Sequence, residues 1–542
     1  MDFFKLSVKF HLIWIIFFAI ILFEIAAFFF LSLGSIGMYF WLSALFIFVS
    51  ISIYSIFYLL KTKSVGKIFV ILIWLIMIGL ILFNATKPRN ISFETTQEAA
   101  CSINFWTNSI DKGFHRSCFL GYPSRQYLLL ATPSMIFGPS LVILNLGGSL
   151  FFVFSMFLWG TGLFLYSNKR GSGAGFFTGL SIAILLHFHY FNHFLFNCFE
   201  QSQFPLSISM SFWGVYLWYL VERKKWHIPL LGLLMLFMAQ MYTSAIAFLV
   251  LAACLLVGLY SQKKIKLWGL LTILIGVSIS FGLTFTHRDD LRLTGENNRS
   301  IAYLIDQGWS LLQHLFWKTQ GVRDYSSLLG KAVLAVAMFS GVFLKSKKVI
   351  LLAVWFLAST FVATVAQGYS YYGLDFRVHR SLVVVPTVIL LVIIFFQQIN
   401  EKVKISFKLK PVYSKLLQWA VFMMVTISGI IYANQYLRTQ TISPHFQLIQ
   451  ALKSEVPQIE NKEEIIFTTK ANSQFISLDD SMGYFLPNLK KKVLEPGLVK
   501  NISADRAILV LDAQEKKFLP EKLQQYDQLI FYFPHRPLHI IY

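Results

Sequence analysis

The chain has 542 residues, of which 56% are hydrophobic and 13% are charged, and its formal net charge is +21. A soluble globular protein carries about 25% charged residues, so this composition excludes an ordinary soluble fold and favours burial of the apolar residues in a lipid bilayer. The basic residues are spread over short segments between apolar runs, which argues for topology signals and against a nucleic-acid-binding surface.

About thirteen apolar runs follow one another, and each can form a membrane helix if the shorter ones cross a thinned part of the bilayer. They cover residues 11–33, 38–60, 68–84, 140–166, 173–191, 204–221, 228–241, 245–260, 267–286, 330–344, 349–366, 381–397 and 416–434. The first run follows Lys5 and Lys9 and has no small-residue cleavage site, which favours a retained helix over a cleaved signal peptide. Residues 228–260 are too long for one span, so we predict a break near Met241–Ser244.

The charges of the short connections test this count. Every second connection is basic: Lys61, Lys63 and Lys67; Lys169 and Arg170; Arg223, Lys224 and Lys225; Lys263, Lys264 and Lys266; Lys345, Lys347 and Lys348; and Lys402, Lys404, Lys408, Lys410 and Lys415. The other short connections, near residues 34–37, 192–203 and 242–244, contain no Lys or Arg. By the positive-inside rule the basic connections are cytoplasmic, which places the N-terminus inside and the C-terminus outside.

This topology predicts the fold class and the domains. Residues 1–435 form a polytopic α-helical membrane domain, with long outer connections at 85–139 and 287–329. Residues 436–542 have a more ordinary composition and form a small extracytoplasmic α/β domain. Its predicted strands are 464–469, 507–511 and 528–533, and its predicted helices are 446–456 and 519–526.

The four cysteines divide into two pairs of different character. Cys101 and Cys118 share the outer connection 85–139, where a disulfide and two free thiols both remain open, because spacing alone does not fix the Cα separation. Cys198 and Cys254 lie in or near apolar runs, and we expect them to be buried thiols.

The outer connection 85–139 contains the most informative pattern. Glu94 and Glu98 are four residues apart, which puts both carboxylates on one face of a helix. A carboxylate at the membrane surface can act as a general base or bind a cation, and it can equally stabilise the positive end of a helix. The sequence continues with Gly-Tyr-Pro at residues 121–123 and an apolar run that closes in Phe-Gly-Pro-Ser at residues 137–140.

This order of elements resembles the GT-C glycosyltransferases and, more narrowly, the bacterial protein-mannosyltransferase and aminoarabinose-transferase superfamily. Residues 122–127 stand where that family has a proline-rich element, and residues 375–380, followed by Pro386, are similar to its later element of an Arg before a proline-containing helix. The sequence departs from the family at Ser124 and Arg125, and by two helices that precede the usual first span.

The resemblance implies transfer of a sugar, with inversion, from a polyprenyl-phosphate-linked donor to a lipid, glycan or protein acceptor. The reaction would take place on the outer face of the plasma (inner) membrane. Gln97-Glu98-Ala99 matches the position of the family's acidic residue, so the resemblance implies a catalytic role for Glu98, with Glu94 in reserve. The arginines implied to bind the donor phosphate are Arg377 and Arg380, then Arg116 and Arg125, and more weakly Arg288 and Arg292.

Tyr122, Tyr372 and Asp375 are implied to contact the sugar or the acceptor. No metal ligand is assigned, and the use of a divalent cation stays open. His187, His189 and His193 at the outer end of one run are either metal ligands or interfacial histidines. Membrane lipids are the expected surroundings, and nucleic acid is not an expected partner.

Two other functions remain open on the sequence. A transporter or flippase of lipid or polysaccharide normally carries ionisable residues or broken helices near the bilayer midplane. The predicted spans are nearly free of such residues, with Glu24 as the main exception, which favours chemistry at the outer surface. A non-catalytic assembly protein with the same fold is the third alternative.

Overall fold

The computed structural model describes the chain in segments. They are residues 6–29, 34–85, 136–138, 140–169, 174–187, 203–240, 245–286, 411–439, 444–456, 459–468, 489–495, 506–512, 528–533 and 536–542, with single residues and pairs between them. The first ten described helices form a bundle. They are α1 (Leu6–Phe29), α2 (Gly34–Lys61), α3 (Lys67–Ala85), α7 (Leu141–Asn168), α8 (Ala174–Leu185), α10 (Gln203–Glu222), α11 (His227–Ala239), α12 (Ala245–Ser261), α13 (Leu267–Thr286) and α19 (Pro411–Thr439).

These segments form helices because they are apolar on every side and carry proline only where a helix tolerates it. Pro205 and Pro229 lie in the first turns of α10 and α11, and Pro411 is the first residue of α19. At these positions the missing N–H has no intrahelical partner to lose. A helix that is hydrophobic all round belongs in a membrane or in the core of a large protein.

Within the described residues, three helices are long and apolar enough to cross a membrane. They contain Tyr39–Lys61, Ser149–Asn168 and Lys415–Gln435. Six shorter apolar helices accompany them, in α1, α3, α8, α11, α12 and α13. The chain is therefore an α-helical integral membrane protein. The predicted runs between 330 and 397 lie almost wholly outside the described residues.

The centre of the bundle is the contact between α7 and α10, the most extensive of the described helix pairs. Gly162 and Gly214 face each other so closely that a Cβ on Gly162 would lie 2.0 Å from the Gly214 carbonyl oxygen. The large side chains of Trp159 and Trp218 are fully buried on these helices. Small residues at the crossing let two backbones approach, which is the usual packing device between membrane helices.

Two further contacts at glycine fix the outer helices of the bundle. α8 packs against both α3 and α19 through Gly179, whose added Cβ would meet Phe69 and Phe422. α1 packs against α11 and α13, where Gly232 and Gly276 leave room for the Phe17 ring. α2 packs against α1 and α7, so both N-terminal helices of the described part are packed parts of the bundle.

The long apolar stretch 228–260 forms two helices, as its length predicts. α11 ends at Ala239 and α12 begins at Ala245, so the predicted break falls between them. The prediction for Cys254 was wrong, because this cysteine is an exposed free thiol on α12. An apolar run in a membrane helix can face lipid as well as protein, so apolar neighbours in sequence do not imply burial. Cys101, Cys118 and Cys198 lie outside the described residues.

The C-terminal part contains a five-stranded mixed sheet in the order β2-β1-β3-β5-β4. Its strands are β1 (Glu464–Thr468), β2 (Lys490–Leu494), β3 (Ala507–Asp512), β4 (Gln528–Phe533) and β5 (Arg536–Ile541). β2, β1 and β3 are parallel, and β5 pairs antiparallel with both β3 and β4. The three strands predicted from the sequence are present as β1, β3 and β4, and the first predicted helix is present as α20 (Pro444–Glu455). The second predicted helix, 519–526, lies outside the described residues.

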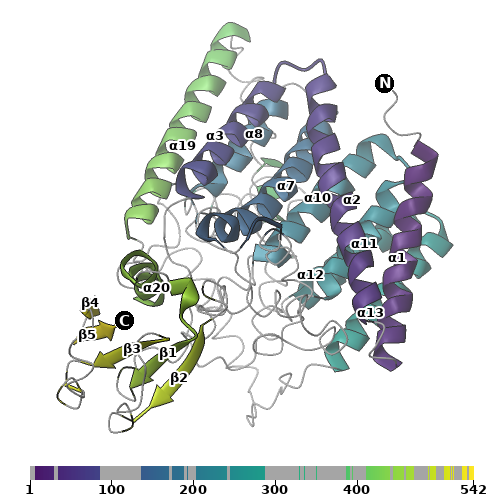
Figure 1. The fold of residues 1–542 in the computed structure, drawn as a ribbon. Coiled ribbons are helices and arrows are strands. Elements are labelled where there is room, and N and C mark those ends of the chain that lie inside the picture. Colours follow the sequence, from purple (N-terminus) through teal and green to yellow (C-terminus); the bar gives the residue numbers. More distant parts are fainter. Residues whose placement is uncertain are drawn as a thin grey trace, which may run out of the picture.

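Both faces of the sheet centre are buried. Ile465 and Phe467 on one face belong to the same apolar cluster as Leu448 and Leu452 of α20. Ile466 packs on the other face in a separate cluster with residues of β3 and β5. Parallel strands covered on both faces are typical of α/β units. Figure 1 shows this sheet and α20 beyond one end of α19, at the end of the bundle opposite the connection from α2 to α3.

Candidate functional site

The residues that the sequence assigns to the site all lie outside the described residues. This applies to the carboxylates, the arginines and the sugar-binding residues alike: Glu94, Glu98, Arg116, Tyr122, Arg125, Tyr372, Asp375, Arg377 and Arg380. His189 and His193 are outside them too. The described helices show from which end of the bundle the segment 85–139 extends, and which polar groups that end contains.

The connection 85–139 leaves and re-enters the bundle at one end. α3 begins at Lys67 in one basic connection, and α7 ends at Asn168 beside the basic Lys169. Their other ends, Ala85 and Leu141, are therefore at the opposite side of the bundle, where the connection begins and finishes. The candidate catalytic segment thus lies between helix ends that are remote from these two basic connections.

Two residues of the Phe-Gly-Pro-Ser sequence at 137–140 have a clear structural role at the start of α7. Gly138 has φ of +81°, a conformation that favours glycine. Ser140 is the N-cap of α7, and its Oγ accepts a hydrogen bond of 3.2 Å from the backbone N–H of Ile143. Such a cap satisfies one of the first N–H groups of the helix. The motif therefore fixes where the connection 85–139 ends and α7 begins.

A buried carboxylate lies in the same half of the bundle. Glu24 of α1 is 1% exposed, and its Oε1 accepts a hydrogen bond of 2.7 Å from Nε2 of Gln240, at the C-cap of α11. The same nitrogen donates to Oγ of Ser280 on α13. A primary amide has two N–H donors, so the Gln240 side chain can connect α11 to both α1 and α13. Glu24 is five residues before the end of α1, which corresponds to about 8 Å.

His187 follows α8 in the same half of the bundle and contacts α19. It is 1% exposed, and its Nε2 lies 2.9 Å from the carbonyl oxygen of Val425 and 3.4 Å from Oγ of Ser428. Gly429 makes room for this contact, since a Cβ there would lie 3.2 Å from the same nitrogen. The contact holds α8 against the helix that leads to the C-terminal sheet. It gives His187 a packing role, and within the described residues no three His, Cys, Asp or Glu side chains form a metal site.

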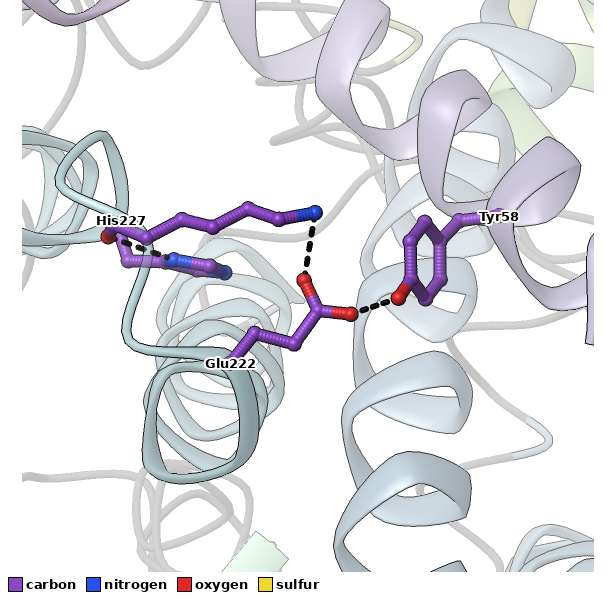
Figure 2. Close-up of polar contacts among 4 residues, drawn as sticks. Tyr58, Glu222 and His227 are labelled. Atoms are coloured by element: carbon purple, nitrogen blue, oxygen red, sulfur yellow. Dashed lines mark hydrogen bonds and ion pairs between the residues drawn. The ribbon is translucent and has the colours of Figure 1, made fainter.

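A second polar cluster lies at the opposite end of the bundle. Figure 2 shows the Glu222 carboxylate at the end of α10, where it accepts a hydrogen bond from the Tyr58 hydroxyl of α2. Its other oxygen lies 2.7 Å from Nζ of Lys224, which also stands 4.9 Å above the Tyr58 ring. His227 completes the cluster: it is fully buried, its Nδ1 lies 3.0 Å from the Lys224 carbonyl oxygen, and its ring stacks on Trp226.

Sequence reasoning named Glu24 but not its partners Gln240 and Ser280, and it did not find the Glu222 cluster. Gln240 gave a weak signal, because it is a carboxamide within an otherwise apolar stretch. Tyr58 and Glu222 gave none, since both stand at the ends of runs where polar residues are ordinary, and they are 164 residues apart. Only the packing of α2 against the α10–α11 connection brings them together.

Comparisons with known proteins give structural similarity without sequence similarity. No protein-family model and no curated protein matches the chain. The structure is similar to ArnT from Cupriavidus metallidurans, an aminoarabinose transferase, in the apo state, with 13% identity, coverage of 87% of this chain and 97% of that chain, and a TM-score of 0.47. For ArnT bound to undecaprenyl phosphate the identity is 13%, the coverage 86% and 97%, and the TM-score 0.49.

A third similar structure is the Archaeoglobus fulgidus oligosaccharyltransferase tethered with an acceptor peptide. It has 9% identity, coverage of 88% of this chain and 74% of that chain, and a TM-score of 0.44. Both neighbours are GT-C glycosyltransferases, the class that the sequence pattern resembles. At these TM-scores the similarity concerns the general course of the chain and transfers no site residue to it.

Proposed function

We propose that this chain is a membrane glycosyltransferase that moves a sugar from a polyprenyl-phosphate carrier to an acceptor on the face of the membrane opposite its basic connections. The observation that carries the proposal is the order of Glu98, Gly-Tyr-Pro at 121–123 and Phe-Gly-Pro-Ser at 137–140. These elements share one connection, and α3 and α7 present both of its ends on the side remote from the basic residues.

The chemistry suits this location. A polyprenyl tail is apolar and stays in the bilayer, so the donor's phosphate and sugar lie at the depth of the lipid headgroups. The Glu98 carboxylate would take the proton of an acceptor hydroxyl, whose oxygen then forms the new glycosidic bond with inversion. The bond between the sugar and the phosphate oxygen breaks, and Arg377 and Arg380 would stabilise the negative charge on the departing phosphate.

The described helices give less support to a transporter. Transport through the membrane needs ionisable groups or broken helices near the midplane. The buried acidic side chain within the described membrane helices is Glu24, which stands near one end of α1 and is hydrogen-bonded between helices. Its burial is explained by this contact between helices, which requires no substrate path.

The direct test is transfer of radiolabelled sugar from a synthetic polyprenyl-phosphate donor by purified protein. Glu98→Gln keeps the size of the side chain and removes the base, so we expect the rate to fall by about 10²–10⁴-fold. Glu94→Gln is the matched control on the same segment, and we expect it to keep most of the activity. Equal loss in both variants would assign the effect to the segment as a whole, and unchanged transfer by Glu98→Gln would refute its role.

A second set of assays tests the proposed phosphate-binding role of Arg377 and the use of a divalent cation. Arg377→Lys keeps the charge but removes the bidentate guanidinium, so we expect weaker donor binding and a raised KM. Assays with EDTA, with and without added Mg²⁺ or Mn²⁺, test the use of a divalent cation. If the wild-type protein transfers no sugar from a range of donors to lipid, glycan and peptide acceptors, the proposed function is wrong.

A further inference from the structure

Four connections meet at one end of the bundle and form what we call the basic face. Its members are Lys61, Lys63, Lys67, Lys169, Arg223, Lys224, Lys225, Lys263, Lys264 and Lys266. Contacts join the connections in turn. Gly66 lies against Gly175 at the start of α8, Tyr58 binds Glu222, and the Tyr219 hydroxyl donates a hydrogen bond of 2.6 Å to the carbonyl oxygen of Lys264. These residues therefore share one continuous surface.

The positive charge of this face is almost uncompensated. Within the described parts of the four connections the acidic residue is Glu222, and its carboxylate is already engaged by Tyr58 and Lys224. Lys63, Lys225 and Lys266 are exposed, and the side-chain ammonium group of none of them makes a hydrogen bond or ion pair with another described residue. Several ammonium groups are thus available to an anionic partner.

Two basic residues of this face have a left-handed backbone conformation. Arg223 and Lys263 follow α10 and α12 with φ of 53° and 54°. This left-handed conformation at the end of a helix favours glycine, because a Cβ clashes with the following carbonyl. Both positions nevertheless hold a basic residue. Strain that persists in a structure is a sign of another constraint on the position.

The neighbouring side chains place the face at the depth of lipid headgroups. Trp268 is 79% exposed and stands two residues after Lys266, and Val65 is 83% exposed between two lysines. Tyr260, in the last turn of α12 and three residues before Lys263, is exposed as well. Aromatic rings gather where a membrane protein meets the headgroups, and the apolar stems of lysines lie along the same boundary.

We propose that the basic face binds the phosphate headgroups of anionic phospholipids in the leaflet that borders it. Basic residues at a membrane surface attract anionic headgroups, each adding about five-fold to the binding constant. A lipid is the occupant that the surroundings fit, because the lysines alternate with exposed apolar and aromatic side chains at one depth. This inference is independent of the proposed transferase activity.

The test uses the full chain in nanodiscs that contain equal amounts of phosphatidylcholine and phosphatidylglycerol. Lipids that stay bound when the protein is released are counted by native mass spectrometry. We expect enrichment of phosphatidylglycerol by the wild-type protein. The triple substitution Lys63→Gln, Lys225→Gln and Lys266→Gln should reduce the enrichment several-fold, whereas replacement of the same three lysines by arginine should keep it.

A matched control removes three positive charges from the other end of the molecule. Lys490, Lys491 and Lys492 lie on β2, and changing them to Gln should leave the enrichment as it is. The wild-type protein provides a test that needs no variant, because headgroup binding to an exposed charged surface must weaken as salt is added. Equal retention of both lipids by the wild-type protein, or equal enrichment in the wild-type and triple Gln proteins, would overturn the proposal. In that case the charges would serve insertion or a soluble acidic partner.

Discussion

Substitution of Gly214 by alanine should separate the two central helices. Gly214 of α10 faces the backbone of α7, and a Cβ at this position would lie 2.4 Å from the carbonyl oxygen of Leu158. Ordinary contacts of a Cβ begin at 3.4 Å, so α10 would have to move by about 1 Å. The opposing atoms belong to the backbone of a regular helix, which cannot turn aside as a flexible side chain can.

The expected loss of stability follows from two opposing effects. Overpacking a close-packed interior costs about 1–3 kcal/mol, and the rigid backbone puts this site at the upper end of the range. Alanine has a higher helix propensity than glycine by about 1 kcal/mol, which offsets part of the cost. We therefore expect Gly214→Ala to lower the free energy of unfolding by about 2 kcal/mol.

The measurement is reversible unfolding in mixed micelles with increasing SDS, followed by circular dichroism and tryptophan fluorescence. Trp213 and Trp218 are buried on the same helix and contribute to the fluorescence, together with the other tryptophans of the chain. Gly258→Ala on α12 is the matched control, because nothing lies within 4 Å of its added Cβ, and it should unfold at the same or a higher SDS concentration. If Gly214→Ala is as stable as Gly258→Ala, the close approach of α7 and α10 is wrong.

Two further predictions concern polar groups of the bundle. Glu24→Gln keeps an acceptor for the Gln240 amide and should unfold like the wild-type protein in the same SDS titration. Glu24→Leu leaves a buried N–H without that acceptor, so its free energy of unfolding should fall by about 1–3 kcal/mol. Equal stability of the two variants would contradict the hydrogen bond. Arg223→Gly relieves the left-handed strain after α10, so it should raise the free energy of unfolding by about 1 kcal/mol and raise the thermal unfolding midpoint. Lys225→Gly, the control next to it, should not raise the midpoint. A lower midpoint for Arg223→Gly would show that the side chain contributes more to stability than the strain removes.

The membrane helices were predictable because several sequence features, namely apolar length, helix start and loop charge, indicate the same helices. A span such as α7 combines 28 mostly apolar residues with a defined start, where Gly138 and Ser140 set the turn and the cap. The break between α11 and α12 was predictable from length and from loop charge together. The strands β1 and β3 were found because short runs of β-branched residues stand out against the more polar C-terminal sequence.

The lateral contacts were not predictable, for a physical reason. A membrane helix is apolar on the side that faces lipid and on the side that faces protein, so periodicity does not tell the two apart. Cys254 shows the consequence, since it lies in an apolar run and is nevertheless exposed. The partners of Glu24 on α11 and α13 were hidden in the same way, because only the folded bundle brings Gln240 within reach of α1.

The candidate site residues belong neither to the predictable helices and strands nor to the lateral contacts, because they lie in long connections between helices. Glu98 and Arg377 were chosen from the order of a degenerate pattern and from the chemistry that a phosphate and a hydroxyl require. Their assignment stays a prediction. The described helices restrict only the end of the bundle from which the segment with Glu98 extends, and the segment with Arg377 lies outside the described residues.

The division of polar groups between the two ends of the bundle suggests how such a protein can change its substrate without refolding. The tight backbone contact of Gly162 and Gly214 and the bridge at Gln240 leave little tolerance for change within the helices. The connection 85–139 begins at the end of α3 and finishes at the start of α7, so insertions there do not disturb the packed seams. Under the proposed transferase function, variation in substrate should therefore concentrate in segments such as 85–139 and 287–329. Changes at the helix crossings should instead alter stability, with little effect on the choice of substrate.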